Sequence, residues 1–423
     1  MSHNKQTKSS SARALSTTLS ALLLFCALNA WLTLAPPRFC DPAEFPYHGW
    51  SYWSLKAMQQ ADPSSVNVVV LGSSLIAAAF PECDATFVQK QPLDLCFYRG
   101  AAYLDQQMRY RFERNYQTLN LAGPGQIPSD AYLTMKAALA NGITPGVVIY
   151  CLAPRDFIDN TLKDTCDTEA FHYLSHIVDV RDCAQDLFRN PVTRLDWDLQ
   201  RSFQLYGAAV HYSLAMDAAG SGALRCLLAT IEGRQHGDIM RRRINGINGI
   251  LPQYQPFNLN PGRAMAAVLK DPGPFLNNVQ DYKDRYKQPN IAAYRTQIGF
   301  LERLITLCQS KHIGIILVNM PITKQNIELL DSTWRRQYFG DLARISTAHG
   351  VEFLDQCEFE RYSRQDFRDS VHLNGFGGKK FIDRLVEKMA VRSGAAKAVL
   401  AAGNDEKRSM AASRATNFRA GIQ

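Results

Sequence analysis

The 423-residue sequence predicts an α/β fold: a flavodoxin-like, three-layer parallel sheet with a helical insertion, preceded by one transmembrane helix. Short apolar runs alternate with stretches of helical periodicity, which is typical of a parallel sheet covered on both faces. Two polar strings, Gly72-Ser73-Ser74 and Asp369-Ser370-Val371-His372-Leu373-Asn374, each follow such a run. Because sites in open α/β sheets form at the carboxyl ends of strands, we expect the two strings to meet there.

Each element is expected from its own pattern. Apolar runs predict five strands, at 67–71, 118–121, 146–152, 313–319 and 351–354. Apolar residues at helical spacing predict helices at about 51–60, 129–140, 290–309 and 378–390. Much of 171–286 has helical character and is too long for one crossover, so we expect a helical insertion or cap over the sheet.

The N-terminus predicts a membrane anchor. Residues 14–35 carry no charge, and about 20 apolar residues span a bilayer core as a helix. Three basic residues in 1–13 favour a cytoplasmic N-terminus and a body outside the cytoplasm. A cleaved signal peptide and a buried core helix are the alternatives. The expected order is therefore a cytoplasmic basic segment 1–13, an anchor 14–35, a juxtamembrane linker 36–63, the main domain 64–392 and a disordered tail 393–423.

Charge and cysteine content exclude several classes of function. The net charge of +8 lies mostly in the two termini, so the near-neutral body does not predict a nucleic-acid partner. No C-x-x-C pair or other metal-ligand spacing is present, and the sequence predicts neither a metal nor a cofactor. If the body lies in an oxidising compartment, Cys83 with Cys96 and Cys166 with Cys183 are candidate disulfides. Otherwise these cysteines are small buried hydrophobic residues.

The two polar strings together contain the groups needed for nucleophilic acyl chemistry. The Ser74 hydroxyl would attack an acyl carbonyl, His372 would act as general base and then acid, and Asp369 would orient the imidazole. Structural roles are open beside this one. The two serines would then only cap the following helix, and Asp369 would only cap a turn with His372 on the surface.

These strings resemble the sequence blocks of the SGNH (GDSL-like) hydrolase superfamily over roughly 64–160 and 290–390. Gly72-Ser73-Ser74 stands where the family has Gly-Asp-Ser, and the string from Asp369 to Asn374 matches its last block. The string Asn120-Leu121-Ala122-Gly123 is similar to the block with the oxyanion glycine, which implies that role for Gly123. The block that carries the oxyanion Asn reads Ala153-Pro154-Arg155-Asp156 here, without that Asn. Arg155 is then either a charged oxyanion donor or the partner of Asp156.

The anchor and the departures from the blocks are similar to the membrane-anchored branch of the superfamily. That branch includes alginate O-acetylation proteins and the D-alanyl transfer protein of teichoic acid synthesis. The resemblance implies a single-pass protein of the cell membrane with its body on the extracytoplasmic (periplasmic) side. It implies an O-acyltransferase or esterase that acts on an acylated envelope polysaccharide or glycolipid, with a polytopic membrane-bound acyltransferase as partner.

Two other functions compete with the enzyme. The missing block-three Asn favours a catalytically inert scaffold or glycan-binding component of a polymer-modification complex. A phosphate or nucleotide binder using Gly72-Ser73-Ser74 is disfavoured, because the loop lacks the Lys and the glycine spacing of a P-loop.

Overall fold

The computed structural model describes residues 6–34, 49–159, 165–175, 177–188, 190–203, 205 and 265–403. The chain divides into two compact units. The span unit comprises Met1–Tyr47 and Phe188–Pro252, and the sheet unit comprises His48–Leu187 and Gln253–Gln423. The first part of the expected linker (36–48), the middle of the expected insertion and the tail from residue 404 lie outside the described residues.

The sheet unit is built on five parallel strands. They are β1 (Val68–Gly72), β3 (Thr118–Asn120), β4 (Val147–Leu152), β6 (Gly314–Asn319) and β7 (Glu352–Asp355). Their spatial order is β3-β1-β4-β6-β7, which is 2-1-3-4-5 when the strands are numbered along the chain. This is the flavodoxin-like order, so the expected fold class is confirmed. The topological switch point, where ligands bind in such sheets, lies between β1 and β4.

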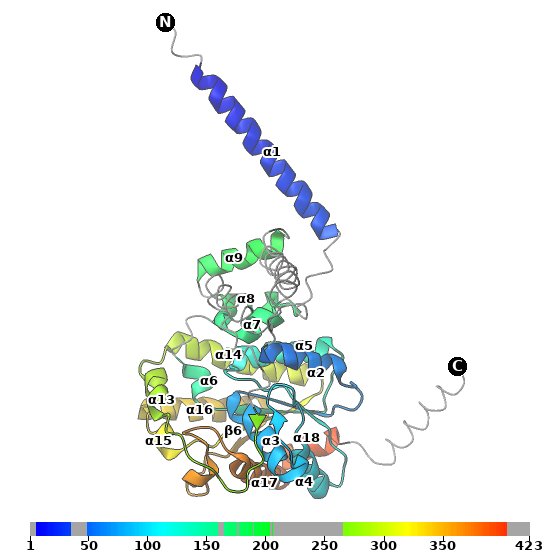
Figure 1. The fold of residues 1–423 in the computed structure, drawn as a ribbon, viewed down its shortest axis with the longest axis vertical. Helices are drawn as coiled ribbons and strands as arrows, with labels where there is room; N and C mark the ends of the chain where they lie inside the picture. The colour runs from blue at the N-terminus through cyan, green and yellow to red at the C-terminus, as the bar shows by residue number, and fades with distance from the viewer. Residues whose placement is uncertain are drawn as a thin grey trace, which may run out of the picture. The chain divides into compact units, whose positions relative to one another are not determined.

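Helices cover both faces of the sheet, as the apolar strands require. One layer contains α3 (Ser74–Cys83), α4 (Ala102–Phe112), α17 (Gly375–Val391) and α18 (Ser393–Ala402), and the other contains α5 (Pro128–Ala140), α14 (Ile291–Ser310) and α16 (Ser332–His349) (Figure 1). Every residue of β1 and β4 is buried between these layers. The predicted strands and helices are confirmed with shifts of one to three residues at their ends.

Short elements complete the sheet unit. They are α2 (Trp50–Gln60), η2 (Asp84–Gln89), β2 (Leu93–Asp94), α6 (Arg155–Ile158), η3 (Thr165–Asp167), α7 (Glu169–Leu174), η4 (Arg181–Cys183), α8 (Ala184–Leu187), β5 (Met265–Ala266), α13 (Val279–Tyr286), α15 (Lys324–Ile327) and η6 (Arg364–Asp366). The strands β2 and β5 pair antiparallel. Strand β5 follows the span-unit residues Phe188–Pro252 in the chain and belongs to the sheet unit.

The second half of the expected linker at 36–63 contains the helix expected at about 51–60, which is α2 and belongs to the sheet unit. Helix α2 packs on α5 and α7 through buried residues that include Trp50, Leu55 and Met58. The buried guanidinium of Arg99 donates to the carbonyl oxygens of Trp50 and Ala122, both at 3.0 Å. These contacts place α2 in the core of the sheet unit, so this unit begins before residue 64.

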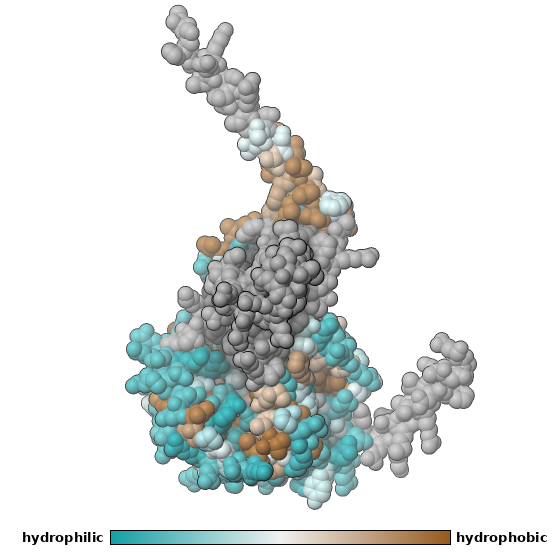
Figure 2. All heavy atoms as spheres, in the orientation of Figure 1, coloured by the Kyte–Doolittle hydropathy of each residue, from teal (hydrophilic) through white to brown (hydrophobic). Residues whose placement is uncertain are grey.

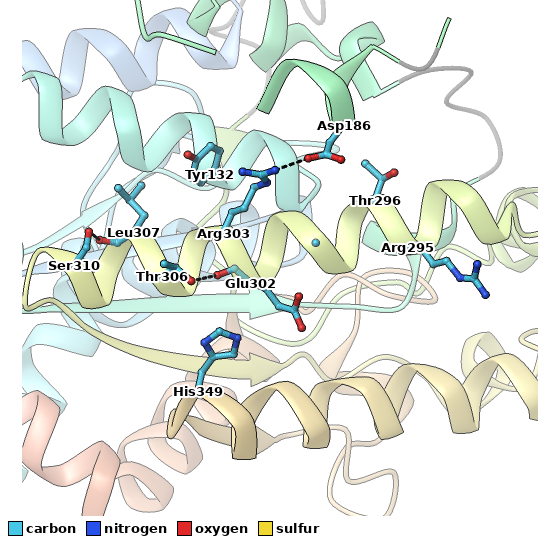
Figure 3. Close-up of a pocket in the computed structure, with 11 residues that line it drawn as sticks. Tyr132, Asp186, Arg295, Thr296, Glu302, Arg303, Thr306, Leu307, Ser310 and His349 are labelled. Carbon is cyan, nitrogen blue, oxygen red and sulfur yellow. Dashed lines mark hydrogen bonds and ion pairs between the residues drawn. The ribbon is translucent and has the colours of Figure 1, made fainter. Parts of the chain in front are cut away.

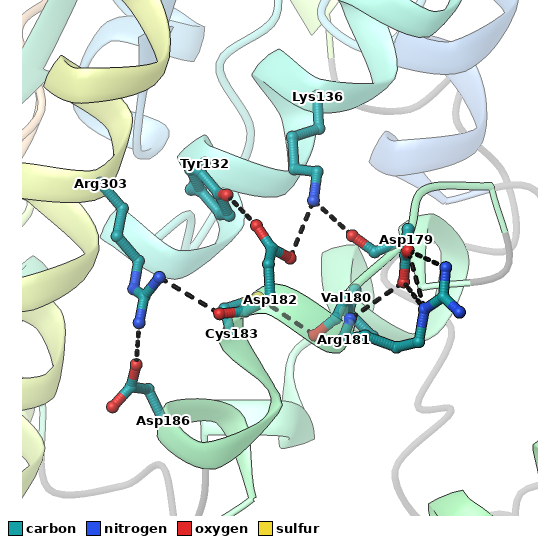
Figure 4. Close-up of polar contacts among 9 residues, drawn as sticks. All are labelled: Tyr132, Lys136, Asp179, Val180, Arg181, Asp182, Cys183, Asp186 and Arg303. Atoms are coloured by element: carbon teal, nitrogen blue, oxygen red, sulfur yellow. Dashed lines mark hydrogen bonds and ion pairs between the residues drawn. The ribbon is translucent and has the colours of Figure 1, made fainter.

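The stretch 171–286, expected as a helical insertion or cap, is divided between the two units. Its beginning, up to Leu187, belongs to the sheet unit. There Asp182 accepts hydrogen bonds from Tyr132 and Lys136 of α5 (Figure 4). Asp186 pairs with Arg303 of α14 at 2.6 Å. Only Phe188–Pro252 of this stretch belongs to the span unit, so the stretch is not one continuous cap.

The expected disordered tail at 393–423 begins instead as a helix, α18. Ala395, Val399 and Ala402 are buried in it. The glycines that precede β4 and begin β6 allow this approach, because a Cβ on Gly314 would lie 2.9 Å from the Cβ of Ala398. The Ala-rich composition suggested a tail, but small side chains also let a helix pack close to the sheet.

The two candidate disulfides are absent. Cys83, Cys96, Cys166 and Cys183 all carry free thiols and are buried. Burial raises the pKa of Cys96 to about 11 and that of Cys183 to about 12. These residues are therefore small buried hydrophobic side chains, the second of the two interpretations.

The span unit begins with α1 (Gln6–Leu34). Its segment Thr17–Leu34 is long and apolar enough to cross a bilayer, and little of that segment is buried by the rest of the chain. The exposed apolar surface of this half of the helix is brown in Figure 2. By length and composition, α1 is thus a candidate membrane span.

Candidate active site

Ser74 lies just after the end of β1, next to the switch point. Strand β1 ends at Gly72, where only a glycine fits. Gly72 has φ +146°, and a Cβ there would lie 2.6 Å from the carbonyl oxygen of Cys151 on β4. Its N–H donates to Oε1 of Gln126 at 2.7 Å. The chain then turns directly into α3, whose first residue is Ser74. The hydroxyl is therefore presented at the carboxyl edge of the central strand.

Ser74, His372 and Asp369 form a continuous hydrogen-bonded chain. Nε2 of His372 lies 2.8 Å from Oγ of Ser74, and Nδ1 lies 2.7 Å from Oδ2 of Asp369. An ionised Asp369 can only accept, so Nδ1 carries the proton and Nε2 is left to accept the Ser74 hydroxyl proton. Residues 298 positions apart are thus joined in the arrangement that the sequence predicted.

Asp369 has both of the roles that were left open for it. Its Oδ1 accepts the N–H groups of Val371 and His372 at 2.9 Å each, which caps the turn. Its Oδ2 holds the imidazole. Because the His372 side chain is only 16% exposed, the alternative of a surface histidine is wrong.

The structure also distinguishes the two neighbouring serines. Ser73 is buried, and its hydroxyl donates to Oδ2 of Asp156 at 3.4 Å. Ser73 occupies the N-cap position of α3 but makes no side-chain cap hydrogen bond. Ser74 contacts the imidazole instead, so a role limited to capping is wrong for it.

The protonation states of the acids differ with their surroundings. Burial acts to raise the pKa of Asp369, but the hydrogen bonds and charge of His372 and the two backbone N–H groups lower it below its usual value. Asp369 therefore stays ionised at neutral pH. Burial raises the pKa of Asp156 to about 7, although Arg155 opposes this. Burial thus acts against ionisation of the acid behind Ser73.

The loop that carries Asp369 and His372 is fixed by residues that sequence reasoning missed. Asn278, just before α13, accepts hydrogen bonds from the N–H and the hydroxyl of Ser370 at 3.0 and 2.6 Å. Asn326 donates to the same hydroxyl at 3.1 Å. Thr323 donates its N–H to the Ser370 carbonyl at 3.1 Å. The one sequence signal for this network was Ser370, a polar residue between Asp369 and Val371 that needs hydrogen-bond partners if it is buried.

A second group of contacts holds this loop against α3. Glu82 is buried on α3 and pairs at 2.7 Å with Arg368, the residue before Asp369. Burial raises the pKa of Glu82, with opposing contributions from Arg368 and His372. The glycines after the motif let α17 approach closely, because a Cβ on Gly375 or Gly378 would lie 2.7 Å from a carbonyl oxygen of α3. This packing brings His372 next to Ser74.

The role expected for Gly123 is wrong in this structure. Its N–H donates to the carbonyl oxygen of Gly72 at 3.0 Å, extending the line of contacts between β1 and β3. It is therefore not free to face a developing oxyanion. The N–H of Ser74 is better placed, because a first helical residue has no intrahelical acceptor and no acceptor is found for it among the described residues.

Arg155 lies on α6 at the end of β4, the strand that pairs with β1. Its Nε donates to Oδ2 of Asp159 at 2.9 Å, whereas the expected partner Asp156 is 4.0 Å away. Asp159 also pairs with Arg285. Burial acts to lower the pKa of Arg155, but Asp159 and Asp156 raise it overall. A Cβ on Gly125 would lie 3.8 Å from Nη2, so the guanidinium borders the loop after β3.

A separate pocket of about 820 Å³ lies along α14. It is lined by residues such as Arg295, Glu302, Arg303 and His349 and contains no member of the Ser74 chain (Figure 3). No cluster of His, Cys, Asp or Glu able to hold a metal ion is found in the part of the chain that the structure describes.

No protein-family model and no curated protein matches the chain. Among solved structures, the chain is similar to a GDSL-like lipase from Bacteroides thetaiotaomicron, with 10% identity and a TM-score of 0.31. That match covers 81% of this chain and 98% of the lipase. The chain is also similar to LAE5, an α/β hydrolase enzyme from the metagenome of Lake Arreo in Spain, with 13% identity and a TM-score of 0.33, over 82% of this chain and 100% of that one. At these scores the likeness carries no argument, and the α/β fold rests on the strand order and the site on its own geometry.

Proposed function

We propose that this chain is a serine esterase or O-acyltransferase that acts on an acylated polysaccharide or glycolipid of the cell envelope. The observation that carries the proposal is the hydrogen-bonded chain from Ser74 through His372 to Asp369. It contains a nucleophile, a general base and an orienting carboxylate at hydrogen-bonding distances.

The reaction follows from this geometry. Nε2 of His372 takes the proton of the Ser74 hydroxyl as Oγ attacks the acyl carbonyl, and Asp369 stabilises the imidazolium. His372 then returns the proton to the departing alcohol, which leaves an acyl ester on Ser74. Water or an acceptor hydroxyl next gives its proton to His372 and attacks that ester, and His372 returns this proton to Oγ of Ser74 as the acyl–Oγ bond breaks. Water makes the protein an esterase, and a glycan hydroxyl makes it a transferase.

Two donors would face the oxyanion in this scheme. They are the N–H of Ser74 and Nη2 of Arg155, which stands where the superfamily block has Asn. In known enzymes the loss of one such donor lowers the rate by about 10²–10³. Gly123 would shape the loop beside them rather than donate.

The cellular setting of this proposal rests on α1. A single span with three basic residues before residue 14 would place the sheet unit outside the cytoplasm. There the active site would have access to envelope polymers. A polytopic membrane-bound acyltransferase would be the source of the acyl group.

An inert scaffold is the second candidate. The absent block-three Asn and the occupied Gly123 N–H favour it, because both remove oxyanion donors. A scaffold would use the same fold to hold a glycan or to assemble a polymer-modification complex.

Labelling with a serine-directed fluorophosphonate separates the two candidates. The full chain in detergent should be labelled, and the label should be lost in Ser74→Ala and in His372→Ala. Ser73→Ala is the matched control and should keep the label, because that hydroxyl contacts Asp156 and not the imidazole. For ester turnover, the Ser74→Ala/His372→Ala double variant should be hardly slower than either single variant, since the two groups act as a unit. A folded wild type that resists the label and leaves acetylated glycans intact would favour the scaffold.

A further inference from the structure

Helix α9 (Pro191–Ser202) of the span unit has an exposed apolar face. Val192, Leu195 and Leu199 are 72%, 58% and 37% exposed, and their spacing of three and four residues places them on one side. Other residues of α9 make contacts of their own. Trp197 stacks on Phe188 with ring centroids 5.0 Å apart, and Arg194 pairs with Asp198 at 3.1 Å.

The residues after α9 pack on the apolar half of α1. The ring of Phe203 lies 5.4 Å from that of Phe25, and the N–H of Leu205 donates to Oδ1 of Asn29 at 2.9 Å. Phe25 is near the middle of the segment Thr17–Leu34. At 1.5 Å of rise per residue it lies about 13 Å from the end of α1, well inside a hydrocarbon layer about 30 Å thick.

Asn29 gives this contact a physical reason. A polar residue in a membrane span is costly unless it is paired, and backbone at membrane depth needs a partner for each N–H. Asn29 is only 7% exposed and supplies an acceptor to the N–H of Leu205, which follows the end of α9. A solvent-facing segment would need no such acceptor, because water would serve the N–H.

We propose that α9 is a membrane-embedded helix whose Val192, Leu195 and Leu199 face lipid acyl chains beside α1. The helix carries Arg194 and Arg201 against Asp196 and Asp198, so it has no net charge. Its insertion is driven by apolar burial rather than by attraction to anionic headgroups. The sheet unit is thereby tied to the bilayer at two places along the chain, before residue 35 and at 191–205. The proposal requires α1 to span the membrane but does not depend on the acyl chemistry.

Photocrosslinking in proteoliposomes tests this placement. The full chain is prepared with p-benzoylphenylalanine in place of Leu195, and a second sample carries it in place of Val192 in case the first does not fold. Arg194 is the matched control position on the opposite side of α9, and Leu24, 68% exposed on α1, is the positive control. The vesicles contain radiolabelled phosphatidylcholine alone, or with phosphatidylglycerol.

Positions 195 and 192 should form phospholipid adducts at a yield similar to position 24 and at least five-fold above position 194. The yield should be equal in neutral and anionic vesicles and should not change in high salt. Adducts at 24 but not at 195 or 192 would overturn the proposal, as would adducts that require phosphatidylglycerol. In native membranes, crosslinks from 195 mainly to another protein would assign the face to a protein partner instead. Fluorophosphonate labelling of the same samples reports separately on the proposed acyl chemistry.

Discussion

At the residue scale, the site depends on which hydroxyl and which carboxylate oxygen contacts His372. Asp369 caps its turn with Oδ1 and holds His372 with Oδ2, so the structural and the catalytic interpretations are compatible. Ser73 and Ser74 are adjacent and chemically alike, yet only Ser74 reaches the imidazole. A sequence pattern identifies the residue types, but the assignment of each hydroxyl and carboxylate oxygen depends on three-dimensional contacts.

Arg155 provides a prediction at this scale, because it has both a structural and a candidate catalytic contact. Arg155→Ala should lower the free energy of unfolding by about 1–3 kcal/mol, less than for a fully broken buried pair, because Asp159 keeps Arg285. It should also lower kcat for a small ester by about 10²-fold if an Nη faces the oxyanion. Melting curves and initial rates measure the two effects. Arg285→Ala is the control that weakens the same carboxylate pair, and an equal loss of kcat in both variants would mean that Arg155 is structural only.

At the element scale, the motif loop is held by segments that are distant in the sequence. The stretch 272–278 runs beside it, with Leu276 donating its N–H to the Arg368 carbonyl and Asn374 donating to the Pro272 carbonyl. On the other side, Glu82 of α3 pairs with Arg368. The segment 272–278, which follows the span unit in the chain, therefore helps to position the imidazole.

Asn278 gives the prediction that belongs to this scale. Asn278→Ala removes the acceptor of both Ser370 donors, so the loop should shift and the Ser74–His372 distance should lengthen. Misplacement of about 1 Å can cost about 10²-fold in rate. We expect fluorophosphonate labelling to slow by about 10–100-fold, with a loss of about 1–3 kcal/mol in unfolding free energy.

The neighbouring Asn277→Ala is the matched control for this experiment. Asn277 is exposed and only accepts the N–H of Val279 at 3.3 Å, so its labelling rate should stay close to that of the wild type. A normal labelling rate in Asn278→Ala would show that Asn326 and Thr323 suffice to hold the loop.

At the scale of the whole molecule, the sheet unit buries several acids whose pKa values are strongly raised. Burial raises the pKa of Asp105, Asp130, Asp156 and Glu169 to about 7 each. The unfolded chain releases these protons near pH 4, while the folded chain keeps them until about pH 7. Because the folded state then binds more protons in this window, the free energy of unfolding should fall as the pH rises from 4 to 7.

Asp130→Asn tests this pH dependence. Asp130 accepts the Thr168 hydroxyl with Oδ1 and the Ile127 N–H with Oδ2. An Asn side chain can keep one of these contacts, with its oxygen on the Ile127 N–H, and can donate its amide to the Thr168 hydroxyl oxygen at the other. The variant should lose less stability than the wild type between pH 5 and pH 7, by roughly 2–3 kcal/mol at about 1.4 kcal/mol per pKa unit. Denaturant unfolding at the two pH values measures it. Asp62→Asn, at an exposed position, should leave the profile unchanged in this range; parallel profiles for wild type and Asp130→Asn would contradict the raised pKa.

The sequence by itself determined the parallel sheet, the five strands, the apolar N-terminal helix and the identity of Ser74, His372 and Asp369. These follow from local patterns: β-branched runs favour buried strands, an uncharged and largely apolar stretch of 18 residues favours a long helix, and the Asp-x-x-His spacing delivers two side chains from one loop. Only the tertiary structure decided that Gly123 donates to Gly72, that Arg155 pairs with Asp159, and that Asn278 and Glu82 position the loop. Each of these depends on which strands and helices lie side by side. Single hydrogen bonds between residues far apart in the chain leave no periodic pattern in the sequence.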